Sequence, residues 1–204
     1  MAAGLVFTGG VLTGRGLAGS PAVEAAPAPP APTVTVTADP PATPAAVRPV
    51  PPAAGPPAPP TRLVVPKLDI KAPVVDIDLS SDAVLEPPSD PDLVGWWTGS
   101  AEPGATQGRV VVTGHTVSTG GGALDLLPEL EPGDKVVLVT ATGRHRYRVT
   151  DSLFASYRDV AEHAQDIFGQ TETSPAGARL ILVTCTGFNG RFYAGNSIVV
   201  ARPL

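Results

Sequence analysis

Short runs of Val, Ile and Leu recur along residues 61–204, and Gly, Pro, Asp or Ser clusters bound each run. Such runs are typical of β-strands, because β-branched side chains pack well on a pleated surface and the flanking residues form turns. No helix-period segment follows each run, which argues against a doubly wound sheet and predicts an antiparallel or mixed β-barrel. The runs span residues 62–66, 72–79, 109–115, 135–140, 145–154, 179–185 and 196–201.

Helical periodicity is scarce in the same region. The best helical segment is DVAEHAQDIF at 159–168, and residues 123–130 predict a further short turn of helix. The expected fold is therefore mostly β, with one or two short helices.

The first part of the chain has a different composition. Fifteen of the 25 Pro residues lie within 21–60, among Ala, Val and Thr and without an apolar period, so this segment predicts an extended linker. Residues 1–20 are apolar and Gly-rich, and we interpret them as a truncated membrane anchor or signal segment; a disordered apolar tail is the alternative. The folded domain is expected over 61–204.

Charge and cysteine content exclude several classes of function. The chain has 14 basic and 19 acidic residues, a net charge of −5, and no Lys/Arg-rich run, so we expect no nucleic-acid partner. A single Cys excludes an intramolecular disulfide framework and a multi-Cys metal site. Asp76, Asp78 and Asp82 are interpreted as a solvated edge. We therefore expect no metal and no cofactor.

Two polar residues at strand ends could carry chemistry. Cys185 ends the run RLILVT and His115 ends the run RVVVTG. Two strands that each deliver one such side chain to a sheet rim can build a nucleophile and its acid/base partner. Arg191, six residues after Cys185, could stabilise an oxyanion. Taken alone, a Cys in this position is more often a buried small hydrophobe, and a His after Thr-Gly is usually a turn residue.

The other two His residues are not assigned to the site. His145 stands between Arg144 and Arg146 on an alternating strand and is expected to be solvated, while His163 lies in the helical segment. Three scattered His and one Cys lack the spacing of zinc ligands.

Four segments in a fixed order carry a resemblance to a known family. They are VGWWTGSAEPG at 94–104, VVVTGHT at 110–116, LEPGDKV at 130–136 and LILVTCTG at 180–187. Their order and spacing resemble a sortase, most closely the class F sortases of high-GC Gram-positive bacteria. The resemblance covers residues 61–204, and an apolar N-terminus with a Pro-rich stalk also fits the family layout.

The resemblance implies an eight-stranded sortase β-barrel and a cysteine transpeptidase. Such an enzyme cleaves a Leu-Pro-x-Thr-Gly-like sorting signal between Thr and Gly through a thioacyl intermediate. A cell-wall precursor or pilin Lys amine then accepts the substrate protein. The resemblance makes Cys185 the nucleophile and His115 the general acid/base, and places Gly114, Thr184 and Thr186 around the peptide. It also implies an extracytoplasmic, membrane-tethered monomer.

One position departs from the family pattern. Many members carry the catalytic Arg in a Tyr-Arg-Asp-Asn-type segment, and the matching stretch here reads YAGN at 193–196, with Ala194 in place of the Arg. We hypothesise that the loop is re-registered so that Arg191 reaches the site; otherwise backbone N–H groups near Thr186 stabilise the oxyanion. A catalytically impaired module that binds sorting signals without turnover is the alternative function. An L,D-transpeptidase-like cross-linker is disfavoured, because the Ser-His-Gly-type run is missing before Cys185.

Overall fold

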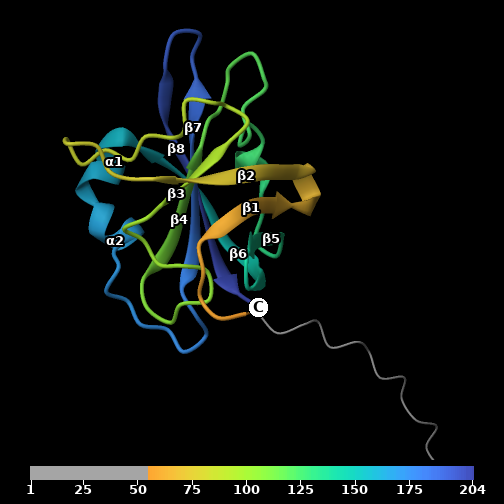
Figure 1. Cartoon of the computed structure of the whole chain (residues 1–204). Helices are drawn as coiled ribbons and strands as arrows, with labels where there is room; N and C mark the ends of the chain where they lie inside the picture. Colours follow the sequence, from red (N-terminus) through yellow and green to blue (C-terminus); the bar gives the residue numbers. More distant parts are fainter. Residues whose placement is uncertain (1–54) are drawn as a thin grey trace, which may run out of the picture. The chain divides into compact units, whose positions relative to one another are not determined.

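The structure, a computed structural model, describes residues 55–204 and is built from eight β-strands (Figure 1). The expected anchor segment 1–20 and most of the expected linker 21–60 lie outside the described residues. The strands are β1 (Pro60–Val65), β2 (Ile70–Ile77), β3 (Val94–Trp97), β4 (Arg109–Gly114), β5 (Lys135–Thr140), β6 (Gly143–Ser156), β7 (Arg179–Phe188) and β8 (Tyr193–Pro203).

The strands close into a barrel in the order β1-β2-β3-β4-β7-β8-β6-β5, and β1 pairs with β5 to complete the ring. Two of the neighbouring pairs, β2–β3 and β4–β7, are parallel, and the rest are antiparallel. The mostly-β fold and the eight-stranded barrel are as expected. Seven of the strands correspond to the seven apolar runs, whereas β3 has four residues and was not among them.

Strand alternation divides the apolar residues between two clusters. The inward residues of all eight strands fill the barrel, and Leu124, Leu127 and Leu130 close one end of it. The second cluster lies outside the barrel, where Val111, Ile181, Val183 and Ile198 pack under two short helices. The pair Trp96 and Trp97 is split between them, since Trp96 lies in the interior and Trp97 packs against the outer cluster.

The helical segment differs in detail from the expectation. It forms two helices, α1 (Tyr157–Glu162) and α2 (Ala164–Phe168), because the backbone leaves the helical region at His163 (φ −114°, ψ 20°). A capping box starts α1: Ser156 accepts from the Asp159 N–H, and the Asp159 carboxylate accepts from the Ser156 N–H. Residues 123–130 form a short 3₁₀ turn, η2 (Leu127–Glu129).

His145 was expected to be solvated, and this is wrong. Its side chain is 3% exposed, because it lies opposite the interior Leu138 in the β5–β6 pair and therefore points into the barrel. Burial lowers the pKa of His145, since the charged imidazolium would lose its hydration. The neighbouring Arg144 and Arg146 point outward, as the alternation requires.

Within residues 55–204, no helix is long and apolar enough to cross a membrane.

Candidate active site

His115 and Cys185 come from neighbouring strands. The parallel pair β4–β7 is registered up to Thr113 and Val183, and His115 and Cys185 each follow two residues later, His115 just beyond the end of β4. Neighbouring strands lie roughly 4.8 Å apart, and residues at the same register share a face. Both residues are half-buried. The structure thus brings the two proposed reactive side chains to one place at the end of β4.

The shared face is the outside of the barrel. Leu182 belongs to the interior cluster, whereas Ile181 and Val183 belong to the outer cluster beneath α1 and α2. Cys185 continues the outward series, so its thiol opens beside the helices and not into the barrel. A substrate can reach it there without opening the core.

Tyr157, the first residue of α1, reaches the thiol. Its hydroxyl donates to Cys185 Sγ at 3.9 Å, a long contact of the kind that sulfur allows. Burial raises the pKa of Tyr157, and the hydrogen bond to Cys185 acts in the same direction. The phenol therefore stays protonated as a donor. Sequence reasoning did not find Tyr157, because the strand β6 that delivers it lies two places from β7 in the barrel.

Thr184 joins the two halves of the site. Its hydroxyl, 1% exposed, donates to the Gly114 carbonyl oxygen at 2.8 Å and lies 2.7 Å from the Thr116 hydroxyl. A hydroxyl has one hydrogen, and a carbonyl can only accept, so Thr116 must donate to Thr184. Thr184 is thus hydrogen-bonded to both chain neighbours of His115, Gly114 and Thr116, and holds them in place.

Three further hydrogen bonds hold the segment that follows β4. The Tyr193 hydroxyl donates to the Thr116 carbonyl oxygen at 2.7 Å. The Leu124 N–H donates to the His115 carbonyl oxygen at 3.1 Å, and the Asp125 carboxylate accepts from the Val117 N–H at 2.7 Å. His115 is therefore placed on a fixed backbone although it lies outside the regular strand.

Gly114 has a structural role in this arrangement. A Cβ atom there would lie 2.9 Å from Leu124 Cδ1 and 3.0 Å from Val94 Cγ1, which is too close for either buried side chain. Gly114 therefore allows the interior to pack tightly beneath His115, and its carbonyl receives the Thr184 hydroxyl.

The β7–β8 hairpin places Asn196 directly opposite Cys185. The Asn196 amide donates to the Thr184 carbonyl oxygen at a long 3.4 Å, which leaves its second N–H for another acceptor. Ala194 follows on the same face, where its Cβ lies 3.1 Å from the position of a Cβ on Gly187. The register is regular through this stretch, so Ala194 does occupy the place opposite the residues that follow the cysteine.

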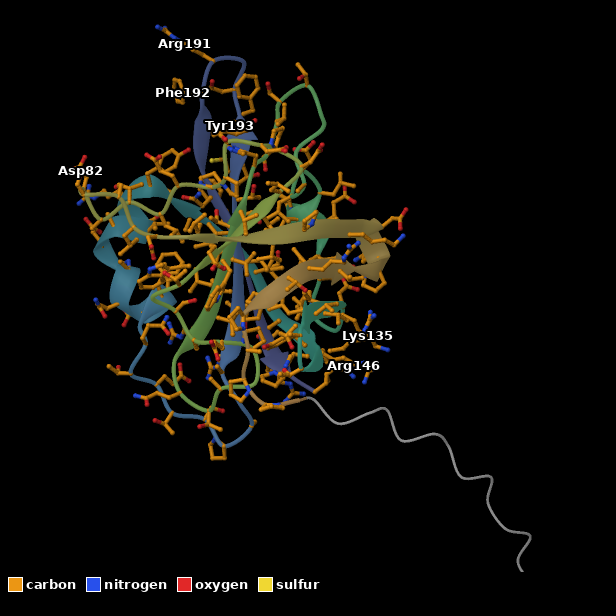
Figure 2. The ribbon with its side chains drawn as sticks, viewed as in Figure 1. Asp82, Lys135, Arg146, Arg191, Phe192 and Tyr193 are labelled. Atoms are coloured by element: carbon orange, nitrogen blue, oxygen red, sulfur yellow. The ribbon has the colours of Figure 1, made fainter. Side chains whose placement is uncertain are left out.

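Arg191 lies in the turn of this hairpin, beyond the last registered pair, Phe188 and Tyr193. The Asn189 side chain accepts from the N–H groups of Arg191 and Phe192 at 3.0 and 3.1 Å and so fixes the turn. Figure 2 shows the Arg191 side chain pointing away from the barrel at the tip. The structure does not bring Arg191 beside Cys185.

Thr186 lies on the other side of the sheet from Cys185. It lines a depression of about 260 Å³ together with Gly187 and with residues of β6, β8 and η2. Its position follows from alternation, since Thr184, two residues earlier, points inward. Among the described residues, no group of three or more His, Cys, Asp or Glu side chains is arranged to hold a metal ion, and Asp82 stands exposed (Figure 2).

The structure is thus a closed eight-stranded barrel with a cysteine in the last part of β7 and a histidine just after the neighbouring parallel strand β4, an arrangement suited to a cysteine transpeptidase. The Sortase domain profile matches residues 63–204, and the chain belongs to the sortase family. Membership implies a cysteine transpeptidase of an extracytoplasmic family that acts on sorting-signal peptides and amine acceptors.

Solved structures of sortases share this fold. Sortase E1 from Streptomyces coelicolor, solved with a tripeptide in its active site, is 25% identical, with a TM-score of 0.55 over 74% of this chain and 91% of that chain. SrtA from Actinomyces oris is 22% identical, with a TM-score of 0.55 over 71% and 79%. Sortase C-1 from the same species is 20% identical, with a TM-score of 0.54 over 70% and 72%. Among curated proteins, no sequence matches this chain.

Proposed function

We propose that the protein is a class F sortase that cleaves a Leu-Pro-x-Thr-Gly-like signal between Thr and Gly. It would then join the substrate protein to a cell-wall or pilin amine. The observation that supports the proposal is the parallel pairing of β4 with β7, since His115 and Cys185 each follow two residues after the last registered pair, Thr113 and Val183. The class rests on the VGWWTGSAEPG and LILVTCTG segments. We also propose that residues 1–20 tether the domain to the membrane.

The geometry supports a two-step acyl transfer. The Cys185 thiolate attacks the Thr carbonyl carbon, and the tetrahedral intermediate collapses with cleavage of the C–N bond to Gly. His115 donates a proton to the departing Gly amine, which leaves a thioacyl bond to Cys185. The acceptor amine attacks this bond, loses a proton to His115 and expels the thiolate. The Tyr157 hydroxyl supports the thiolate as a hydrogen-bond donor.

The oxyanion needs donors on the same face as Cys185. The free N–H of the Asn196 amide is the nearest side-chain candidate by register. β7 is registered with β4 only up to Val183 but with β8 up to Phe188, so the backbone around Thr186 has one open edge. Arg191 would take part only if the hairpin folded over Cys185. Gly114 and Thr184 act by positioning His115.

The test is a transpeptidation assay with the full chain, a fluorogenic Leu-Pro-x-Thr-Gly peptide and an amine acceptor, with intact mass measured on the same sample. We expect cleavage, amine incorporation and an acyl adduct on the enzyme. Cys185→Ala should abolish all three. His115→Ala should abolish turnover, while the matched control His163→Ala, which changes an exposed His, should retain it. Equal activity of the two His variants would refute the role of His115.

A second function is favoured by one observation, the Ala194 side chain at the position where the family pattern has Arg. In that case the barrel would bind sorting-signal peptides and release them unchanged. Peptide binding without adduct or cleavage, in the folded full chain and across several signal variants, would establish it.

A further inference from the structure

One outer face of the barrel carries a set of aligned cations. In the β5–β6 pair Lys135 lies directly opposite Arg148, and in the β6–β8 pair Arg148 lies directly opposite Arg202. Three positive side chains therefore form a row across three neighbouring strands. We call the six outward cations of β1, β5, β6 and β8 the basic face: Arg62, Lys135, Arg144, Arg146, Arg148 and Arg202.

The basic face has no acidic partners. In the part of the chain that the structure describes, none of its six side chains forms an ion pair with a carboxylate. Other cations do: Lys67 pairs with Asp134, and Arg158 pairs with Glu162. The chain carries 19 acidic residues, so acids are not scarce. Asp151 is the one acidic residue of β5, β6 and β8, and it lies beyond the bulge in β6.

The arrangement lowers the stability of the free protein. Like charges directly opposite each other on a sheet repel at close range. An anionic partner that spans the row would relieve this repulsion. The row lies far along β6 from α1, since α1 begins directly after Ser156, at the other end of this strand. A flat partner therefore fits it better than a small ligand.

The place where the N-terminal segment joins the barrel indicates which anionic partner binds the basic face. Gly55, the first described residue, lies against Thr142 in the turn that joins β5 and β6. The Thr142 hydroxyl donates to the Pro56 carbonyl oxygen at 2.7 Å. The N-terminal segment thus joins the domain at the hairpin that carries Lys135, Arg146 and two further cations, and Figure 2 shows Lys135 and Arg146 pointing outward on this side.

We propose that the basic face docks on an anionic phospholipid surface, that of the membrane to which the N-terminal segment would tether the domain. Each Lys or Arg near such a surface strengthens binding by about fivefold. A tether that holds the domain at the surface raises the effective concentration of the basic face there, so a few cations are enough. This inference goes beyond the proposed transpeptidation, which it does not require, and rests on the proposed membrane tether.

Docking would also orient the site. In the closed barrel β8 and β6 separate β7 from β5. The Cys185 face therefore points away from a surface on which β5 and β6 lie. The domain would present the outer face that carries Cys185 to substrates on the wall side of the membrane.

The experiment uses the full chain and vesicles of phosphatidylcholine with or without phosphatidylglycerol. Zwitterionic vesicles report any binding by the apolar N-terminus alone. The wild type should bind the anionic vesicles more tightly, and this difference should disappear at about 0.5 M salt, where the Debye length falls below ~5 Å. Equal binding to vesicles with and without phosphatidylglycerol would overturn the proposal.

Two matched double variants locate the surface. Arg148→Gln with Arg202→Gln should weaken anionic-vesicle binding about 25-fold, two cations at about fivefold each. Arg158→Gln with Arg179→Gln removes the same charge elsewhere and should change it less than about threefold. Equal weakening by both pairs would overturn the proposal, because net charge alone would explain it. Arg148→Lys with Arg202→Lys should bind as the wild type does.

Two controls keep the outcome decisive. The thermal midpoint of the Arg148/Arg202 glutamine variant should be no lower than that of the wild type, since a repulsion is removed. If that variant does not fold, Lys135→Gln at an exposed position takes its place, with about fivefold weaker binding expected. Binding of soluble polyphosphate without binding to anionic vesicles would overturn the lipid surface in favour of an anionic polymer.

Discussion

The Thr184 hydroxyl donates a 2.8 Å hydrogen bond to the carbonyl oxygen of Gly114, so the strand that carries the cysteine holds the segment that carries the histidine. Neither residue reacts in the proposed mechanism. Their contact sets the distance between the residues that do.

The first prediction concerns this contact. Thr184→Val keeps the shape of the side chain but leaves the Gly114 carbonyl and the Thr116 hydroxyl without their buried partner. We expect a loss of about 1–3 kcal/mol in the free energy of unfolding, measured by urea denaturation. The value of kcat/KM should fall as well, because His115 loses its fixed backbone. Thr184→Ser should recover most of both, and Thr186→Val, which breaks no side-chain hydrogen bond seen among the described residues, is the matched control.

The second prediction concerns Tyr157. Tyr157→Phe removes the hydroxyl that donates to Cys185 Sγ while keeping the ring. Because one hydrogen bond to the thiolate is lost, the rate of thiol alkylation at neutral pH should fall by about 2–10-fold. The thermal midpoint should stay close to that of the wild type, since Tyr157 is 52% exposed. An unchanged alkylation rate would mean that the hydroxyl does not act on the thiol.

The third prediction separates the oxyanion donors. Asn196→Ala should lower kcat by about 10²–10³-fold if its amide supplies a donor to the oxyanion. Arg191→Ala should change kcat by less than about threefold, because the guanidinium lies at the hairpin tip. Steady-state kinetics with the same peptide compare the two. The reverse ranking would show that the hairpin folds over Cys185 during turnover and would restore Arg191 to the site.

The fourth prediction is a gain of activity. Ala194→Arg places a guanidinium where the family pattern has one, on the outer face shared with Asn196 and Cys185. Ala194 is exposed, so the larger side chain can be accommodated. The added donor should raise kcat/KM by up to about 10²-fold. The matched control Ala194→Leu adds bulk without charge and should give no gain; a gain from both would point to packing.

The fifth prediction concerns pH and His145. The pKa of His145 is lowered by burial, so the unfolded chain binds this proton more readily than the folded one. Stability should therefore be full above the unfolded pKa of about 6.5 and decrease as the pH falls below it. Urea unfolding from pH 7 to pH 5 measures the slope. His145→Gln should flatten it, whereas the exposed His163→Gln should not.

Titration of the paired carboxylates does not contribute to the change in stability between pH 7 and pH 5. The pKa values of Asp134 and Glu172 are lowered by their hydrogen bonds to Lys67 and Arg109, so these contributions to stability are lost only at more acidic pH. A steep loss between pH 6.5 and 5 that persists in His145→Gln would contradict the assignment.

Local sequence patterns predicted most of the fold. Val-rich runs bounded by turn residues predicted seven strands. Both signals are local, because β-branched residues favour a strand and turn-forming residues end it within a few positions of one another. β3 was not predicted, because it has only four residues and two of them are Trp, so it lacks the Val-rich run that marked the other strands. The orientation of His145 was predicted wrongly for another reason. Alternation determines which residues share a face of the strand, but closure of the barrel determines which of the two faces is inside.

The site was predicted only in part. Cys185 and His115 were recognised at strand ends, and their adjacency follows from the parallel pairing of β4 with β7 across about 70 residues of chain. Tyr157 could not be found, because β8 stands between its strand and β7. Asn196 could have been predicted as the partner of Cys185 by counting residues outward from the turn of the short β7–β8 hairpin, since the turn fixes which antiparallel residues are paired.

The insertion of β7 between β4 and β8 also governs when the protein can become active. Chains dominated by pairings between distant segments fold slowly, because the loop between the partners must close first. Here the nucleophile joins its acid/base partner only after the C-terminal 26 residues, Arg179–Leu204, have entered the barrel. A chain in which β7 has not yet paired with β4 keeps Cys185 apart from His115. In the proposed mechanism the reactive centre therefore forms late in folding, and transpeptidation depends on β7 having closed the barrel.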